Sequence, residues 1–200
     1  MVSTTAAAAG TKGDRTRRRL LEIAVARFAA DGFRRTSVSD IARDADLTPA
    51  AVYAYFAGKE ALFQAAVDAD ASALIDDSRA EVEGLAMREG VGAMVSVLLR
   101  RVVDHPLAER VLLGKEPEVI GRLLDLPSLL TLTDDVTAQI VVAQTDGEVR
   151  TDVDPRLIAE GLEAIVISVL MSSLQAGVSP ESRRADATRA VLDAALRPPR

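Results

Sequence analysis

Apolar side chains recur every three or four positions along most of the chain, the spacing that gathers them on one face of an α-helix. In the first such segment, residues 14–31, the recurring positions are Leu20, Ile23, Ala24 and Phe28. The same spacing, read with helix-start and helix-stop signals, predicts further helices over residues 59–80, 91–104, 107–113, 117–124, 127–143, 155–176 and 180–197. We therefore predict an all-α fold.

Residues 36–63 contain three helix starts within a short span. Ser37 precedes Asp40 by three residues, close to a capping box, and Thr48 precedes Pro49, an N-cap followed by proline at the first helical position. Gly58-Lys59-Glu60 opens the third helix. Only a short turn separates the first two helices. Two short helices joined in this way predict a helix-turn-helix, whose second helix enters the DNA major groove.

Charge divides the chain in the same place. The chain has a net charge of −6, but residues 1–60 carry ten Lys and Arg against seven Asp and Glu, whereas residues 61–200 carry fourteen against twenty-three. A basic head on an acidic body is typical of a DNA-binding regulator. We predict an N-terminal arm without regular structure at residues 1–13, a DNA-binding domain at 14–60 and a regulatory and dimerisation domain at 61–200.

Composition excludes most catalytic chemistry. The chain has no cysteine and one histidine, so thiolate zinc sites, cysteine nucleophiles and multi-histidine metal sites are excluded. The adjacent carboxylates Asp76-Asp77 and Asp134-Asp135 point away from each other on a helix and are interpreted as surface. His105, beside Pro106, is interpreted as capping a helix C-terminus, with a ligand or pH-switch role as the alternative. We predict a protein that is not an enzyme and has no cofactor or metal.

The order Thr-Ser-Val-x-x-Ile-Ala-x-x-Ala-x-Leu-Thr from Thr36, followed by Val-Tyr-x-Tyr-Phe-x-Gly-Lys-Glu-x-Leu from Val52, strongly resembles the DNA-binding domain of the tetracycline-repressor (TetR) family of transcriptional regulators. The match extends from about Leu20 to Phe63. The resemblance implies a three-helix DNA-binding domain joined to a helical ligand-binding and dimerisation domain. It also implies a ligand-responsive regulator, most simply a repressor, that binds a palindromic double-stranded DNA operator and is released by a small-molecule effector.

The resemblance assigns phosphate contacts to Tyr53, Tyr55 and Lys59. It assigns the same role to Thr36 and Ser37, where free backbone N–H groups and a hydroxyl at a helix start face the DNA backbone.

Base reading would fall to Thr48, Pro49, Ala50 and Ala51, whose short side chains offer a hydroxyl and apolar contacts with thymine methyl groups. The sequence departs from the family pattern at two places: Pro49-Ala50 replaces a polar-glycine pair, and Asp46 replaces the usual turn glycine. Both departures affect which operator sequence is recognised and not whether DNA is bound. Asp tolerates the left-handed conformation that the turn needs.

The predicted recognition helix, Thr48–Phe56, contains no Lys or Arg, so affinity must come largely from outside it. A cluster of cations, Arg15 and Arg17–Arg19, lies at the start of the first helix, where the helix dipole disfavours positive charge. A nearby phosphate would relieve this, and we expect Arg17 or Arg18 to reach the DNA backbone or the minor groove. A solvated basic turn is the alternative.

Residues 155–176 are apolar nearly all round in their second half, Ile165–Met171, so this helix needs cover on more than one side. Together with the small-residue row Ala187, Val191, Ala194 and Ala195 of the last helix, it would form a four-helix bundle between two chains. We expect a homodimer through residues 155–176 and 180–196, the interface that the resemblance also implies, and no membrane span.

Every aromatic residue of the chain lies at or before Phe63, so the body is packed by aliphatic side chains alone. A pocket there would have no stacking cage, and an aliphatic or acyl-chain effector follows as a hypothesis. Plausible lining residues are Met94, Leu98, Val136, Ile140 and Ile165, each with ordinary core packing as the alternative. No secretory signal is visible, so we expect a cytoplasmic protein. A helical protein-interaction module without DNA binding remains the second functional reading.

Overall fold

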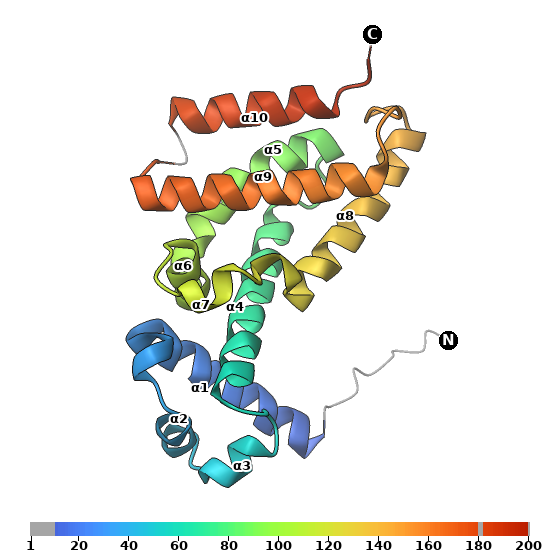
Figure 1. Ribbon diagram of the computed structural model, residues 1–200. Coiled ribbons are helices and arrows are strands. Elements are labelled where there is room, and N and C mark those ends of the chain that lie inside the picture. Colours follow the sequence, from blue (N-terminus) through green and yellow to red (C-terminus); the bar gives the residue numbers. More distant parts are fainter. Residues whose placement is uncertain (1–10, 180–181, 200) are drawn as a thin grey trace, which may run out of the picture. The chain divides into compact units, whose positions relative to one another are not determined.

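The computed structural model describes residues 11–179 and 182–199, and every regular element within these ranges is a helix (Figure 1). The α-helices are α1 (Lys12–Arg35), α2 (Val38–Asp44), α3 (Pro49–Tyr53), α4 (Lys59–Val82), α5 (Met87–Arg101), α6 (Pro106–Leu112), α7 (Pro117–Ile120), α8 (Pro127–Thr145), α9 (Pro155–Ala176) and α10 (Arg183–Leu196). Two 3-10 helices, η1 (Val102–Asp104) and η2 (Leu123–Asp125), join them. The all-α prediction is confirmed.

The first helix begins before the predicted residue. Thr11 caps α1, since its side chain accepts a hydrogen bond from Asp14 N and its backbone N–H donates to Asp14 Oδ2. This reciprocal capping box starts the helix at Lys12 rather than Asp14. Residues 12 and 13 therefore belong to α1, and residues 1–10 of the predicted arm lie outside the described residues.

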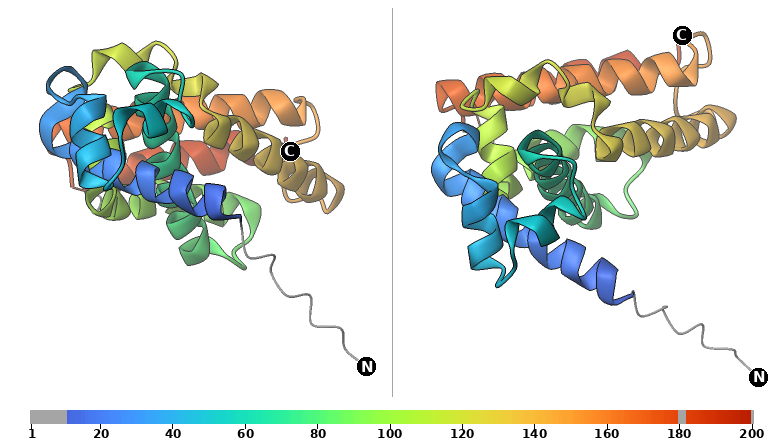
Figure 2. Two further views of the ribbon diagram at one scale, coloured as in Figure 1. Left: turned by 90° about the horizontal axis from the view of Figure 1, so that it is seen from below. Right: turned by 60° about the horizontal axis from the view of Figure 1, so that its bottom comes forward.

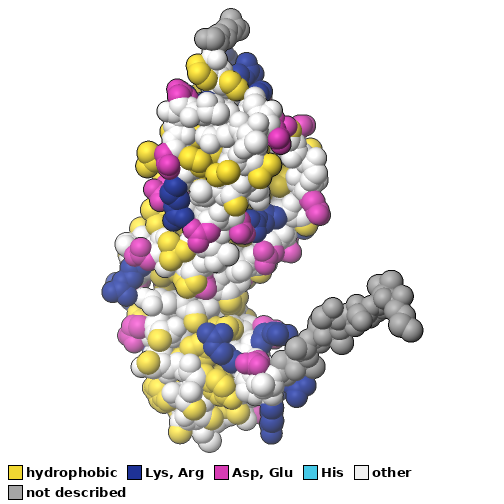
Figure 3. Space-filling model, turned by 90° about the vertical axis from the view of Figure 1, so that its right-hand side faces the viewer, with side chains coloured by type: hydrophobic (Ala, Val, Ile, Leu, Met, Phe, Trp, Pro, Cys, Tyr) yellow, Lys and Arg dark blue, Asp and Glu magenta, His cyan; other side chains and the backbone are white. Residues whose placement is uncertain are grey.

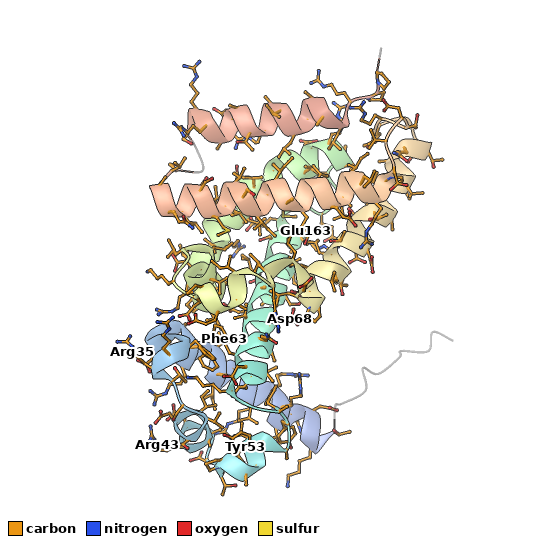
Figure 4. The ribbon with its side chains drawn as sticks, viewed as in Figure 1. Arg35, Arg43, Tyr53, Phe63, Asp68 and Glu163 are labelled. Carbon is orange, nitrogen blue, oxygen red and sulfur yellow. The ribbon has the colours of Figure 1, made fainter. Side chains whose placement is uncertain are left out.

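The chain divides into two compact units between Ala66 and Val67, inside α4. The sequence predicts the division between residues 60 and 61, at the start of the same helix. The difference has a packing reason, because Phe63 lies 4.9 Å from both Phe28 and Phe33, ring centroid to centroid (Figure 4). The first two turns of α4 thus complete the core of the first unit.

Gly32 gives α1 its only internal break. Its φ of 79° lies in the left-handed region that favours glycine, and it kinks α1 three residues before the helix ends at Arg35. Phe33 is thereby brought back against Phe28, with ring centroids 6.4 Å apart. Leu20 and Ala24 are fully buried beneath the same cluster. The sequence predicts that the helix ends at residue 31, before Gly32. In the structure Gly32 is a kink, and helical residues continue to Arg35.

The hydrophobic cluster of the second unit contains no aromatic side chain. This buried cluster is formed mainly by residues from α4, α5, α6, α8, α9 and α10, among them Val95, Ile140 and Leu192. Within this unit α9 packs against α8, and α10 packs against α5 (Figure 2).

His105 does not have the predicted surroundings. The backbone of His105 follows the last residue of η1 and precedes the first residue of α6. Its side chain is buried between two carboxylates of α4. Nε2 lies 3.3 Å from Asp77 Oδ2, and Nδ1 lies 3.7 Å from Asp70 Oδ1. Asp70 Oδ2 accepts hydrogen bonds from the backbone N–H groups of Leu107 and Ala108. The carboxylate of α4 therefore caps α6, and His105 packs beside that cap instead of facing helix carbonyls.

Candidate nucleic-acid interface and ligand cavity

Two side-chain caps and one left-handed residue shape the helix-turn-helix. The Ser37 hydroxyl accepts from Asp40 N and donates to Asp40 Oδ2, which starts α2. Thr48 Oγ1 accepts from Ala51 N and starts α3 with Pro49 in its first turn. Between the helices Asp46 has a φ of 57°, as the sequence predicts for the residue replacing glycine. The turn is therefore built from the residue types that its backbone requires.

Ion pairs fix α2 against α1. The Arg27 guanidinium donates to both carboxylate oxygens of Asp44 and also to Asp31. The hydrogen bond from Arg27 lowers the pKa of Asp44 below its usual value, so this carboxylate stays charged at neutral pH. Ile41 and Ala42 of α2 and Val52 of α3 are buried. The opposite faces of these two helices are therefore exposed to solvent.

The residues predicted to read bases lie at the N-terminal end of α3. Thr48, Pro49 and Ala50 are exposed at its N-terminus and Ala51 is half-buried. Tyr53 and Tyr55, at and just beyond its C-terminus, are 55% and 37% exposed, which is unusual for large apolar rings (Figure 4). The helix is shorter than predicted, Pro49–Tyr53 rather than Thr48–Phe56, because a turn at Ala54 and Tyr55 follows it.

Ser37 and Thr36 differ sharply in position. Ser37 is exposed at the start of α2, although its hydroxyl is engaged with Asp40. Thr36 is buried, and its hydroxyl donates to Gly32 O at 2.9 Å. The predicted phosphate contact by the Thr36 hydroxyl is therefore wrong for this conformation, because closing the end of α1 uses that group. Its role as the C-cap of α1 was not visible in the family pattern.

No Lys or Arg lies on α3, and the cations discussed below belong to α1 and α4. Several Lys and Arg side chains are visible on the face shown in Figure 3. Lys59, at the start of α4, holds its Nζ 4.3 Å from the Phe33 ring centroid, and the Arg17 guanidinium lies 5.2 Å from the Phe56 ring centroid. These cation–π contacts orient two flexible side chains at little cost. Arg18 is exposed, and Arg19 pairs with Asp46 at 3.3 Å in a solvent-exposed bridge.

A cavity of about 700 Å³ lies in the second unit, among α4, α5, α6, α8 and α9. Most of its lining is aliphatic. Of the five lining residues suggested by the sequence, Met94, Leu98 and Val136 line it, whereas Ile140 is fully buried elsewhere in the core and Ile165 is 45% exposed on the outside of α9. The volume is of the size that a small organic ligand occupies.

Asp76, Glu83 and Glu163 are the acidic residues of this lining, and Glu163, which is less exposed than the other two, was missed by the sequence reasoning. Glu163 of α9 accepts a hydrogen bond from the Thr133 hydroxyl of α8 at 2.5 Å, and burial raises the pKa of its carboxyl (Figure 4). A signal was available, since Glu163 follows the buried Ala159 by four residues and so shares its helix face. No group of three or more His, Cys, Asp or Glu side chains that could hold a metal is found among the described residues.

The outer face of α9 is apolar and exposed. Among described residues it is the one helix with the length and composition to cross a membrane, yet only 17% of its most apolar stretch is buried within one chain. Leu157 is 62% exposed on α9, and Val191 is 67% exposed on α10. All four members of the predicted small-residue row, Ala187, Val191, Ala194 and Ala195, are exposed. Exposed apolar surface of this extent is typical of interaction sites.

Comparisons with known proteins agree with this geometry. Residues 20–66 match the family described as bacterial regulatory proteins, tetR family. The HTH-type transcriptional regulator UidR of Escherichia coli is 26% identical over 192 residues, covering 93% of this chain and 95% of UidR. Salmonella enterica GusR has the same fold with a TM-score of 0.63, at 25% identity over 93% of this chain and 97% of its own.

A more distant structure shares the fold alone. FadR of Bacillus subtilis, solved in complex with stearoyl-CoA, superposes with a TM-score of 0.64 at 17% identity, covering 90% of this chain and 97% of that one. Relatives of this kind are regulators and not enzymes. The chain described here is therefore a DNA-binding transcriptional regulator that resembles the tetR family, whose model matches residues 20–66.

Proposed function

We propose that the protein is a homodimeric, cytoplasmic repressor that binds a palindromic operator through α3 and is released by a small aliphatic effector. The observation that supports this most is the outer face of α3, where short side chains and two exposed tyrosines surround a helix without cations. The hydroxyl of an exposed tyrosine can donate to a phosphate oxygen, as such side chains do in many DNA complexes. The alternative, a helical protein-interaction module, predicts no salt-dependent retention on duplex DNA.

Phosphate contacts are proposed for Tyr53, Tyr55, Lys59 and Ser37, and these are the groups that would set affinity. Ser37 would act through the free backbone N–H groups at the start of α2, since its hydroxyl already bonds Asp40. Arg18, exposed on α1, is a further candidate for the backbone or the minor groove. Arg17 shares this role only if its guanidinium leaves Phe56.

Base reading is proposed for Thr48, Pro49, Ala50 and Ala51. The Thr48 hydroxyl already accepts from Ala51 N, so it keeps its own proton to donate to a base acceptor. Pro49 and Ala50 would contact thymine methyl groups. A small change such as Ala50→Ser should therefore alter which operator is preferred without weakening non-specific binding.

Lys59→Ala is expected to weaken binding to operator and non-operator DNA alike and to reduce the slope of log K against log salt by about 1, because one phosphate contact is lost. Fluorescence anisotropy with labelled duplexes over a range of salt concentrations would measure both quantities. Ala50→Ser is the matched comparison. If both variants changed only operator preference, the division into phosphate and base contacts would be wrong.

A homodimer is proposed through the exposed faces of α9 and α10. Leu157, Ile165 and Val191 supply apolar contacts there, and Ala187, Ala194 and Ala195 allow close approach of helices. Dimerisation would present two α3 helices to successive major grooves, about 34–36 Å apart, as a palindrome requires.

Val191→Glu is expected to shift the protein from dimer to monomer at micromolar concentration, because it places a charge in an apolar interface. Sedimentation velocity would show the change. Val103→Glu, at a valine that is 62% exposed outside α9 and α10, is the control and should leave the dimer intact. A dimer that tolerated Val191→Glu would contradict the proposed interface.

The effector is proposed to bind in the cavity of the second unit. The lining is aliphatic, and a stearoyl-CoA complex of the same fold, B. subtilis FadR, indicates that the architecture can hold a long alkyl chain. Release of DNA would follow if the ligand binds more tightly to one arrangement of the two DNA-binding units than to the other. Adding ligand to a preformed protein–operator complex, with anisotropy as the readout, tests this.

A further inference from the structure

The polar part of the cavity lining is acidic. Among the described lining residues, Asp76, Glu83 and Glu163 are the acids and Arg79 is the one cation. Arg79 is already paired, since its guanidinium donates to Asp135 Oδ2 at 2.8 Å. A ligand with an anionic head group would therefore meet carboxylates and no uncommitted positive charge.

Glu163 occupies an unusual position within that lining. Its Oε2 accepts from Thr133, but its Oε1 is buried and has no hydrogen-bond partner in the described structure. Burial raises the pKa of this carboxyl, which means that the empty protein holds its charge at a cost. A buried acceptor without a donor is a group that a ligand can satisfy.

Asp76 and Glu83 are both exposed residues of the same lining, at the C-terminal part of α4 and just beyond it. Their charge would raise the local concentration of cations and lower that of anions. Since the second unit has no aromatic residue, an ammonium group could not be held there by cation–π contacts. The half-buried carboxylate of Glu163 is then the group available to hold it.

We infer that the cavity is built for an aliphatic amine, with the alkyl chain against the aliphatic lining and the protonated nitrogen donating to Oε1 of Glu163. This rests on the proposed effector function and narrows it, because fatty acids and acyl-CoA molecules carry the opposite charge. Glu163 is the specificity-determining residue. Thr133 positions it by holding the other carboxylate oxygen.

The inference is tested by measuring the affinity of the DNA-free protein for decylamine, decanol and decanoate with isothermal titration calorimetry. The three probes share a ten-carbon chain and differ in their head group. The wild-type protein is expected to bind decylamine at least about tenfold more tightly than decanol, and decanoate least tightly, since a hydrogen bond to a buried charge has this magnitude. Decanoate binding as tightly as decylamine would overturn the inference.

Glu163→Gln keeps the shape of the side chain and its contact with Thr133 but removes the charge. Decylamine affinity should fall at least about tenfold while decanol affinity stays within about twofold, because only the amine needs the carboxylate. Glu160→Gln, an exposed acid one turn earlier on α9 and outside the cavity lining, is the matched control and should retain the preference. An unchanged amine-to-alcohol ratio in Glu163→Gln would overturn the assignment.

The ligand-free Glu163→Gln protein supplies an independent readout. If the carboxylate is kept for a ligand, removing its buried charge should raise the melting temperature at neutral pH by about 1–3 °C. A lower melting temperature would mean that Glu163 instead holds α8 to α9. Operator binding by the wild-type protein is measured separately. If the protein binds its operator but not decylamine, this inference alone is refuted. If it binds no operator, the proposed function as a regulator is refuted.

Discussion

Ala50→Glu is expected to weaken operator binding at least about 100-fold, because it introduces a carboxylate among DNA phosphates and base edges. Ala50 is exposed at the second position of α3, where a side chain would lie deepest in the major groove. A carboxylate in the first turn of a helix interacts favourably with the positive end of the helix dipole, so the variant should still fold. Anisotropy with a labelled operator, together with circular dichroism, separates binding from folding.

The matched control for this change is Ala73→Glu. It makes the same substitution at an exposed alanine of α4 in the second unit, and operator affinity should change less than about twofold because distant surface charges are screened. Equal losses in both variants would indicate that net charge, and not the position of α3, decides binding.

Asp70→Ala is expected to lower the free energy of unfolding by about 2–4 kcal/mol, since it leaves two buried backbone N–H groups without an acceptor. Asp70 is 8% exposed, and its Oδ2 accepts from Leu107 N and Ala108 N at 2.9 and 2.8 Å. No side chain of its own caps the N-terminus of α6, so nothing on the helix replaces the lost acceptor. Urea denaturation at fixed protein concentration would show a lower midpoint with an unchanged slope.

Asp70→Asn tests the physical reason, because its amide oxygen can still accept these hydrogen bonds and should restore part of the loss. Asp76→Ala, at an exposed carboxylate of the same helix, should change the free energy of unfolding by less than about 0.5 kcal/mol. If Asp70→Ala were equally mild, the capping role of Asp70 would be disproved.

Local signals were sufficient for most of the architecture. The Thr48-Pro49 start of α3, the left-handed Asp46 and the Asp154-Pro155 start of α9 are all decided by interactions within four residues of chain. Helix bounds therefore follow from the sequence to within a few residues. The exposed positions of Tyr53, Ala50 and Val191 follow as well, because each lies opposite a buried helix face.

Contacts between distant segments could not be predicted in this way. Asp70 meets α6 across 37 residues of sequence, and Glu163 meets Thr133 across 30. Thr36 was assigned to DNA by its place in a motif, although a hydroxyl can equally close the preceding helix, as it does on Gly32 O. His105 was interpreted from its own helix end, and the carboxylates of α4 that surround it were invisible to that reasoning.

Selection of bound sequences from a random duplex library, followed by sedimentation of the protein with the best sequence, tests the central claim most directly. The regulator proposed here should enrich an inverted repeat whose half-sites are about one helical turn apart, and should bind it as two chains per duplex. A monomeric protein that enriches no sequence, and that duplex DNA does not retain even at low salt, would contradict the account.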